Sequence, residues 1–408
     1  MRPRTLVALL VIVAGLVGVA YVGLSDGQGG ELTVAWTSDT AVEGGSNHHE
    51  PAVAVVDGDP MVFAPVSSTK QFGNCALVAL DADSGDEQWR YEVPRANCTT
   101  HSVADPSVAD HDGDGSRSVL ATTTEREVVA FDPHTGAVED RYPLSAYGYS
   151  KPIVANVTGG PATETLVADV RGYVQALSQA GEPVWSVNRS TYVWATPAVA
   201  DLDGDGQTEV AIAGRDGILA AYGADGSAEW ETKAGYAVTW MTTGQLDSDP
   251  AVELVVGTQE GPVAAFDGRT GEYEWQHDTK LLSAVEAVGT VDGVPTVFAT
   301  AGDGSTVALD GRDGSVRWES AITTEAVQMM PPPVLGDVDG DGEDELVIAS
   351  NDGTVSVVAP DTGEVLATHE RDVDVLAHPV LSDTDGDGSA EIYVIYTDGR
   401  VQRLDFES

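Results

Sequence analysis

Positively charged residues are scarce in this sequence. Lysine and arginine total 20 against 66 aspartate and glutamate residues, which gives the 408-residue chain a formal charge of −46. So large a negative charge argues against nucleic acid or an anionic membrane face as an electrostatic partner. Disorder, the simplest alternative for a highly charged chain, is opposed by the 42% of hydrophobic residues, which recur in short regular runs. The lysines are Lys70, Lys151, Lys233 and Lys280.

No cysteine directly follows the apolar segment at the N-terminus, which argues against a lipid-modified cysteine as an anchor. Residues 5–24 are 20 uncharged, mostly apolar residues, a length that spans a bilayer core. Because Arg2 and Arg4 precede them, we expect residues 1–4 in the cytoplasm and the chain after residue 24 outside the cell. This predicts a single-pass transmembrane signal anchor, followed by a flexible linker at 25–30. A cleaved signal peptide, which would release a secreted protein, is the alternative.

The sequence also lacks a linker that would divide the remainder into two domains. Instead, residues 31–408 repeat a pattern of four short apolar runs about every 45 residues. In Thr196–Trp230, the first run ends in a carboxylate-rich loop and the second ends at Asp216-Gly217, a strong hairpin signal. Each copy therefore predicts four antiparallel strands. Equivalent loop positions in the copies are Val55, Asp110, Asn156, Asp201, Gln245, Thr290, Asp337 and Asp383.

The third and fourth runs of the copies share a signature. It reads ALDADSGDEQW at 79–89, AFDGRTGEYEW at 265–275 and ALDGRDGSVRW at 308–318. This resembles the pyrroloquinoline-quinone-type propeller repeat, Ala-x-Asp-x-x-Thr-Gly-x-x-x-Trp, in which the tryptophan packs between neighbouring blades. The resemblance implies that residues 31–408 form an all-β propeller of four-stranded antiparallel blades.

The two ends of the repeat region predict the number of blades. Residues 399–405, GRVQRLD, are typical of a third strand, and no fourth strand follows them. Residues 32–38, LTVAWTS, are typical of a fourth strand with its tryptophan, Trp36, but no first three strands precede them. Pairing these segments closes a ring of eight blades and leaves no open sheet edge. Seven blades would leave one repeat unplaced.

Three acidic loops carry oxygen donors at alternating positions. Carboxylates at loop positions 1, 3, 5 and 9 suit Ca²⁺ better than Mg²⁺, which retains its waters. The pattern is similar to the calcium loops of integrin-type propellers, which implies a structural ion; turns that merely reflect an acidic composition are the alternative. A fourth loop, at Asp110, Asp112 and Asp114, has Ser118 at position 9 and should bind more weakly. The complete loops are Asp201, Asp203, Asp205 and Glu209; Asp337, Asp339, Asp341 and Glu345; and Asp383, Asp385, Asp387 and Glu391.

Polar and aromatic residues that do not repeat lie just before the first strand of most copies. First strands line the channel of a propeller, so these residues should converge at one mouth, opposite the acidic loops. We interpret this mouth as a funnel for a protein or glycan ligand, with ordinary filling of the channel as the alternative. The residues are His48, His49, Glu50, His101, Asp105, Lys151, Trp194, Trp240 and His378.

Histidines and cysteines near this mouth allow two further interpretations. His48, His49 and His378 lie in blades that abut on closure, but unrelated rim histidines are favoured over a metal site because the geometry is unknown. Cys75 begins a third strand and Cys98 lies in the loop leading to the second blade. Outside the cell, a disulfide between them is favoured over two free thiols.

Two resemblances bear on function. In repeat type the sequence resembles the eight-bladed assembly-factor lipoprotein of bacterial barrel-insertion machinery, from which only a scaffold role carries over. It also resembles quinoprotein dehydrogenases, but these are larger, and many carry adjacent cysteines above the quinone, a pair that this sequence lacks. We therefore expect a monomeric, non-enzymatic, membrane-tethered module outside the cell, with structural Ca²⁺, no pyrroloquinoline quinone and no catalytic residue. A quinone-dependent dehydrogenase is the alternative.

The charge balance itself suggests an environment. Dense acidic residues with few lysines resemble the composition of proteins from halophilic archaea. We interpret this as adaptation to high salt. The resemblance concerns where the protein works and implies nothing about its function.

Overall fold

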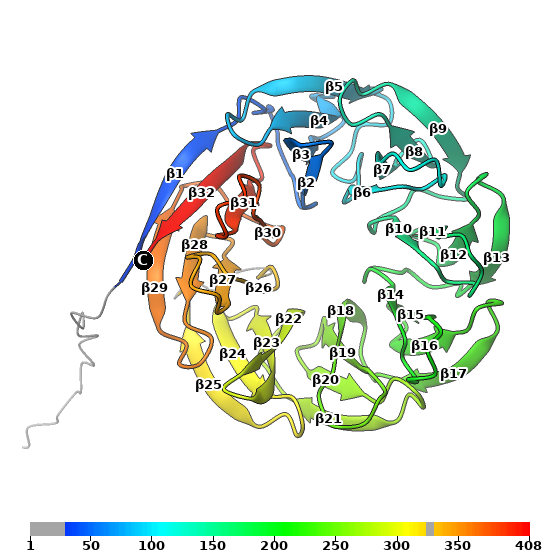
Figure 1. Ribbon diagram of the computed structural model, residues 1–408, viewed down its shortest axis with the longest axis vertical. Coiled ribbons are helices and arrows are strands. Elements are labelled where there is room, and N and C mark those ends of the chain that lie inside the picture. The colour runs from blue at the N-terminus through cyan, green and yellow to red at the C-terminus, as the bar shows by residue number, and fades with distance from the viewer. Residues whose placement is uncertain (1–28, 324–329) are drawn as a thin grey trace, which may run out of the picture.

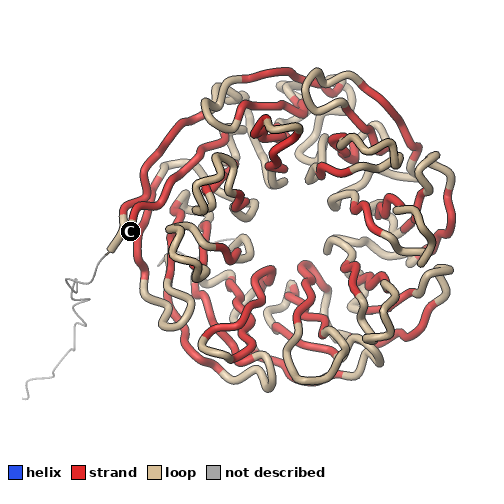
Figure 2. The backbone as a smooth tube through the Cα atoms, viewed as in Figure 1, coloured by secondary structure: helices blue, strands red, loops and turns tan. Residues whose placement is uncertain are grey.

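The computed structural model describes residues 29–323 and 330–408. These residues form 32 β-strands and no helix. Figures 1 and 2 show the strands arranged in a ring. The strands make eight four-stranded antiparallel sheets, arranged like blades around a common centre (Figure 1). The predicted all-β, eight-bladed propeller is therefore confirmed.

In each blade, hydrogen-bonded neighbours run from the innermost strand to the outermost one. The innermost strands are β2 (Ala52–Val56), β6 (Ser107–Ala109), β10 (Ile153–Ala155), β14 (Ala198–Ala200), β18 (Val238–Gly244), β22 (Ser283–Val291), β26 (Val334–Gly336) and β30 (Val380–Ser382). The second strands are β3 (Asp59–Val66), β7 (Ser118–Thr123), β11 (Glu164–Ala168), β15 (Glu209–Ala213), β19 (Glu253–Thr258), β23 (Val294–Ala301), β27 (Glu345–Ala349) and β31 (Glu391–Ile395). The third strands are β4 (Cys75–Asp81), β8 (Glu127–Phe131), β12 (Tyr173–Leu177), β16 (Ile218–Tyr222), β20 (Val263–Phe266), β24 (Ser305–Asp310), β28 (Thr354–Val358) and β32 (Val401–Glu407). The outermost strands are β5 (Glu87–Val93), β9 (Val138–Pro143), β13 (Pro183–Asn188), β17 (Ala228–Lys233), β21 (Tyr273–His277), β25 (Val316–Ala321), β29 (Val365–Glu370) and β1 (Glu31–Thr37).

Burial explains why the four strands of a blade have different sequences. The second and third strands, such as β15 and β16, are buried on both faces by neighbouring blades and are mainly apolar. Outer strands such as β5 turn one face to solvent and alternate between exposed and buried residues. One hydrophobic cluster joins Phe63 and Leu77 of one blade to Phe131 of the next. The core is therefore a series of layers between blades.

In six of the eight blades, a signature tryptophan packs against the turn of the next blade. The indole N–H of Trp275 donates a hydrogen bond of 2.6 Å to the carbonyl oxygen of Gly311. At the ring closure, Trp36 donates one of 2.8 Å to Ala82. The glycine of the receiving turn leaves room for the indole, since a Cβ added at Gly85 would lie 2.5 Å from Trp36 Cε3 and the residue has a positive φ of 74°. The tryptophan of one signature and the glycine of the next therefore form the same contact between neighbouring blades.

The N-terminal strand completes the eighth blade, as predicted. β1 lies beside β32 (Figure 1) and pairs antiparallel with it. In this pairing, Trp36 stands opposite Arg403. Most of the other blades place alanine opposite the tryptophan, as in Ala265 opposite Trp275. The eighth blade therefore differs from the repeat at the point where the ring closes.

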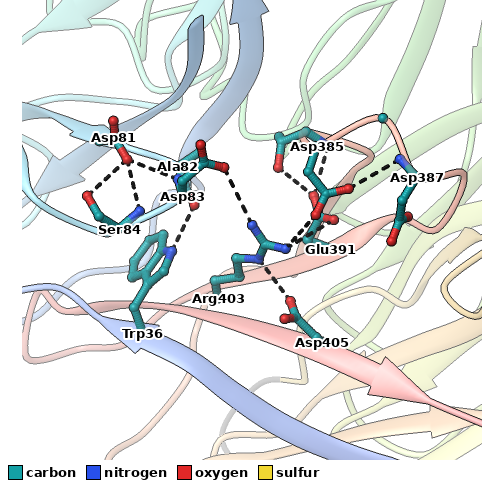
Figure 3. A network of polar contacts seen from close by, with 12 residues as sticks. Trp36, Asp81, Ala82, Asp83, Ser84, Asp385, Asp387, Glu391, Arg403 and Asp405 are labelled. Carbon is teal, nitrogen blue, oxygen red and sulfur yellow. Dashed lines mark hydrogen bonds and ion pairs between the residues drawn. The ribbon is translucent and has the colours of Figure 1, made fainter.

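Arg403 links this closure to two neighbouring turns (Figure 3). Its Nη2 atom lies 3.1 Å from Asp385 and 3.3 Å from Glu391, and its Nε atom lies 2.8 Å from Asp405. Its Nη1 atom lies 3.8 Å from Asp83, in the turn of the first blade. Burial acts to lower the pKa of Arg403, but the carboxylates of Asp405, Glu391 and Asp385 raise it above its usual value. The guanidinium therefore remains charged between two acidic turns.

None of the described residues belongs to a helix of the length and hydrophobicity needed to cross a membrane. The predicted anchor at 5–24, the residues 1–4 before it and most of the predicted linker at 25–30 lie outside the described residues.

Candidate functional site

A cavity of about 930 Å³ lies at the mouth of the ring. All nine residues that the sequence analysis assigned to the mouth line it. They stand in the loops before β2, β6, β10, β14 and β30, or in β18 in the case of Trp240. The cavity wall also includes Tyr149, Tyr192 and Glu286, which the sequence analysis missed.

Aromatic rings form one side of the cavity. The ring centroids of Tyr192 and Trp194 lie 5.7 Å apart, and that of Tyr149 lies 6.2 Å from Tyr192 and 6.5 Å from Trp194. The guanidinium of Arg215 lies 4.9 Å from the Trp194 centroid, a cation–π contact that steadies the indole. Flat aromatic faces of this kind stack on sugar rings and on planar side chains.

A buried group of charges lies beside this aromatic wall. Glu50 is 7% exposed and forms ion pairs with Lys151 and His378. Burial acts to raise the pKa of Glu50, but the positive charges of His378 and Lys151 hold it far below its usual range. Burial raises the pKa of the nearby Glu286 carboxyl, whereas Glu50 raises that of Lys151. The network thus combines an ionised carboxylate with two cations.

His378 gives this network a dependence on pH. Burial acts to lower its pKa, but the carboxylates of Glu50 and Glu286 outweigh burial and raise the pKa from 6.5 to about 9. A raised histidine pKa stabilises the fold fully below pH 6.5, and this contribution is lost as the pH rises through about 9. We expect the free energy of unfolding to fall by roughly 3 kcal/mol over this range because of His378 alone.

The measurement is denaturant unfolding from pH 6 to 10, with a His378→Gln variant as the reference. Glutamine keeps a hydrogen-bond donor near Glu50 but does not titrate. The difference in the free energy of unfolding between the two proteins should shrink as the pH rises and His378 loses its proton. Other titrating groups, including Lys151, are common to both proteins and cancel in this difference. A difference that stays constant over this range would show that His378 is not protonated in the folded protein.

His48, His49 and His378 do not form a trio, in agreement with the favoured interpretation of the sequence. His48 and His49 lie against His101, whereas His378 lies apart from them against Glu50. Cys75 and Cys98 form a disulfide with a Cα–Cα distance of 5.4 Å. This bond ties the start of β4 to the loop that carries His101.

The acidic loops lie at the other end of the innermost strands. Asp201 directly follows β14, whereas the cavity residue Trp194 precedes it. The Asp201 carboxylate accepts hydrogen bonds from the backbone N–H groups of Asp205 and Gly206 at 3.0 and 2.9 Å. The buried Glu209 accepts one of 2.9 Å from Leu202. The backbone therefore holds Asp201 and Glu209 in place, and carboxylate oxygens of Asp201, Asp203 and Glu209 lie within 4.8 Å of one another.

The same arrangement recurs in the other complete loops. Asp337 accepts from Gly342 N–H at 2.9 Å and Asp383 from Gly388 N–H at 3.2 Å. Burial and the neighbouring carboxylates raise the pKa values of Glu209 and Glu345 to about 7. Carboxylate oxygens also converge within 4.8 Å in the predicted weaker loop, at Asp110, Asp112 and Asp114. Oxygen-only donors at this spacing fit Ca²⁺.

Comparison with known proteins agrees with this architecture. The sequence profile of the family described as outer membrane protein assembly factor BamB matches residues 33–170 and 170–405. The chain belongs to the BamB family. A search of curated protein sequences found no match.

Several solved propellers are similar in fold to this BamB family member. BamB from Moraxella catarrhalis has a TM-score of 0.62 and 16% identity, covering 92% of this chain and 100% of that one. The V. cholerae biofilm matrix protein Bap1 has a TM-score of 0.70 and 14% identity, covering 94% and 91%. The quinohemoprotein alcohol dehydrogenase ADHIIG from Pseudomonas putida HK5 has a TM-score of 0.64 and 14% identity, covering 92% and 76%. Identities this low show a shared fold, and function must be argued from the sites.

Proposed function

We propose that this BamB family propeller is a non-enzymatic binding module that presents its mouth cavity to a protein or glycan ligand. The observation that supports this is the cavity itself, whose wall joins the Tyr149, Tyr192 and Trp194 rings to the ion pairs of Glu50. Concave sites that combine aromatic surface with a few fixed charges are typical binding sites. We further propose that residues 5–24 hold the propeller at the outer side of a membrane, as a monomer.

The charged groups of the cavity favour binding over catalysis. A general acid or base works best when its pKa lies near the working pH. Glu50 titrates far below neutrality, and His378, with a pKa of about 9, stays protonated at neutral pH. Both are therefore suited to hold a fixed charge against a ligand.

Structural Ca²⁺ in the three complete acidic loops is the second part of the proposal. Burial first, and then the neighbouring carboxylates, raise the pKa values of Glu209 and Glu345 to about 7, and a bound cation would offset both effects. The Asp383 loop differs, because Arg403 already contacts its ligand candidates Asp385 and Glu391. We expect this loop to bind Ca²⁺ more weakly than the other two.

Capture of ligands from native membranes tests the binding function. The full chain, held in molar salt with Ca²⁺, should retain a specific protein or glycan. Trp194→Ala should reduce that affinity at least tenfold, since aromatic anchors of an interface commonly contribute 2 kcal/mol or more. Tyr273→Ala, at a ring that is 56% exposed on the outer strand β21, is the matched control and should leave capture unchanged.

Equal capture by the wild type and the Trp194 variant would contradict a role for the cavity. A quinone-dependent dehydrogenase is the competing function, and Cys75 and Cys98 stand 23 residues apart instead of adjacent. Reconstitution with pyrroloquinoline quinone and Ca²⁺, followed by dye reduction with alcohols and sugars, should give no turnover. If turnover is observed and Trp194→Ala abolishes it, the proposed binding function would have to be replaced by a catalytic one.

A further inference from the structure

Three imidazole rings meet in the wall of the mouth cavity. His48 Nε2 lies 2.7 Å from His101 Nδ1, and His49 Nε2 lies 3.2 Å from that same atom. The rings come from two blades, since His48 and His49 precede β2 and His101 precedes β6. One nitrogen of each ring therefore lies within 4.8 Å of one nitrogen of each of the other two.

Hydrogen bonds on the far side of two rings fix their tautomers. His48 Nδ1 lies 3.1 Å from the carbonyl oxygen of Ser46, and His49 Nδ1 lies 3.0 Å from Asp105 Oδ1. A carbonyl and a carboxylate only accept, so both Nδ1 atoms carry the hydrogen, and the Nε2 atoms keep lone pairs directed at His101. Orientation of a ligating histidine by a carboxylate or a carbonyl group is the usual second shell of a protein metal site.

Two of the three rings, those of His48 and His101, are uncharged near neutrality. Burial, with help from the neighbouring His49, lowers the pKa of His48 to about 4. Burial, with help from His48 and His49, lowers that of His101 to about 3. Neutral imidazole is the form that binds metals, which agrees with the arrangement of the three rings.

We propose that His48, His49 and His101 bind a divalent transition metal ion, for which Zn²⁺ is the best fit. Ligand nitrogens about 2.0–2.1 Å from a tetrahedral ion lie about 3.3 Å from one another, so the cluster needs only a small opening between His48 and His101. Nitrogen donors select Zn²⁺, Cu²⁺ or Ni²⁺, in contrast to the oxygen donors of the acidic loops. Because all three histidines line the cavity, the fourth position is open to water or to a donor group of a ligand. This site stands independently of the proposed ligand-binding function.

Metal content and spectroscopy test the site directly. The full chain, purified in molar KCl, is stripped of metals, returned to saturating Ca²⁺ and loaded with Zn²⁺ or Cu²⁺. We expect one tightly bound Zn²⁺ per chain, and electron paramagnetic resonance of the Cu²⁺ form should show coupling to imidazole nitrogens. His101→Ala should lose this ion. His277→Ala, which removes a half-buried histidine of the outer strand β21, is the matched control and should retain it.

Two results obtained with the wild type and a folded His101→Ala variant would overturn the proposal. One is equal Zn²⁺ content in the wild type and a folded His101→Ala variant, and the other is a Cu²⁺ spectrum with oxygen ligands alone. If circular dichroism shows that His101→Ala is unfolded, Asp105→Asn decides, because asparagine still accepts the hydrogen bond of His49 but lacks the charge. We expect Asp105→Asn to weaken Zn²⁺ binding by about 10–100-fold. An unchanged affinity in that variant would refute the site.

Discussion

Replacing Trp36 with alanine is expected to lower the free energy of unfolding by about 3–5 kcal/mol and to release the N-terminal strand from the ring. Trp36 is 8% exposed, lies against Gly85 of the first blade, and its ring centroid is 6.1 Å from that of Tyr393. Its N–H also bonds to Ala82. The variant would leave a cavity beside the pairing of β1 with β32. No hairpin joins these two strands, because they come from opposite ends of the repeat region.

Trp275→Ala is the matched control for this experiment. Trp275 is 5% exposed and makes the same kind of hydrogen bond, but its strand β21 remains joined to β20 by a hairpin. Both variants should lose similar stability in denaturant, measured in molar salt. Only Trp36→Ala should speed hydrogen exchange selectively in β1 and β32. Hydrogen exchange in β1 and β32 could instead be equally slow in the two variants. That result would mean that strand pairing and Arg403 suffice to close the ring.

Lowering the salt concentration from molar to about 0.01 M is expected to unfold or loosen the propeller. The chain carries a formal charge of −46, and the Debye length grows from about 3 Å at 1 M to about 30 Å at 0.01 M. At low salt, charges on different blades therefore repel one another across the ring. The acidic loops should be the most sensitive part, since burial and the neighbouring carboxylates of Asp339, Asp341 and Asp337 already raise the pKa of Glu345 to about 7.

Ca²⁺ should restore only part of this loss. Ions in the loops of Asp201, Asp337 and Asp383 would stabilise the folded form by linkage, but they leave the charges of the outer strands unchanged. Circular dichroism and tryptophan fluorescence against potassium chloride, with and without Ca²⁺, provide the measurement. A flat response from low to molar salt would reject adaptation to high salt. An unchanged melting temperature on chelation at constant salt would reject structural Ca²⁺.

Arg403 shows how the tertiary structure modifies a repeat that the sequence predicts well. The Ala-x-Asp signature becomes Arg403-x-Asp405 in the eighth blade, a departure visible in the sequence but without evident meaning there. In the folded ring, its guanidinium reaches Asp385 in one turn and Asp83 in another (Figure 3). The turns are more than 300 residues apart, and only ring closure brings them to the same side chain.

The sequence by itself determined the blades, their number and the closure by Trp36. These features depend on local patterns, namely alternating burial, hairpin turns and the glycine and tryptophan of the signature. The patterns recur in successive copies of the repeat. The residues of the mouth could also be predicted as a set, because every innermost strand starts at the same face.

Only the tertiary structure decided which mouth residues touch. His101, instead of His378, joins His48 and His49, and His378 pairs with Glu50. These contacts depend on non-repeating loops, one of them held by a disulfide, whose paths no periodicity specifies. Glu286 escaped prediction because it lies within β22 at a register shift between Val285 and Val288, and such a bulge redirects a side chain in a way that alternation cannot reveal.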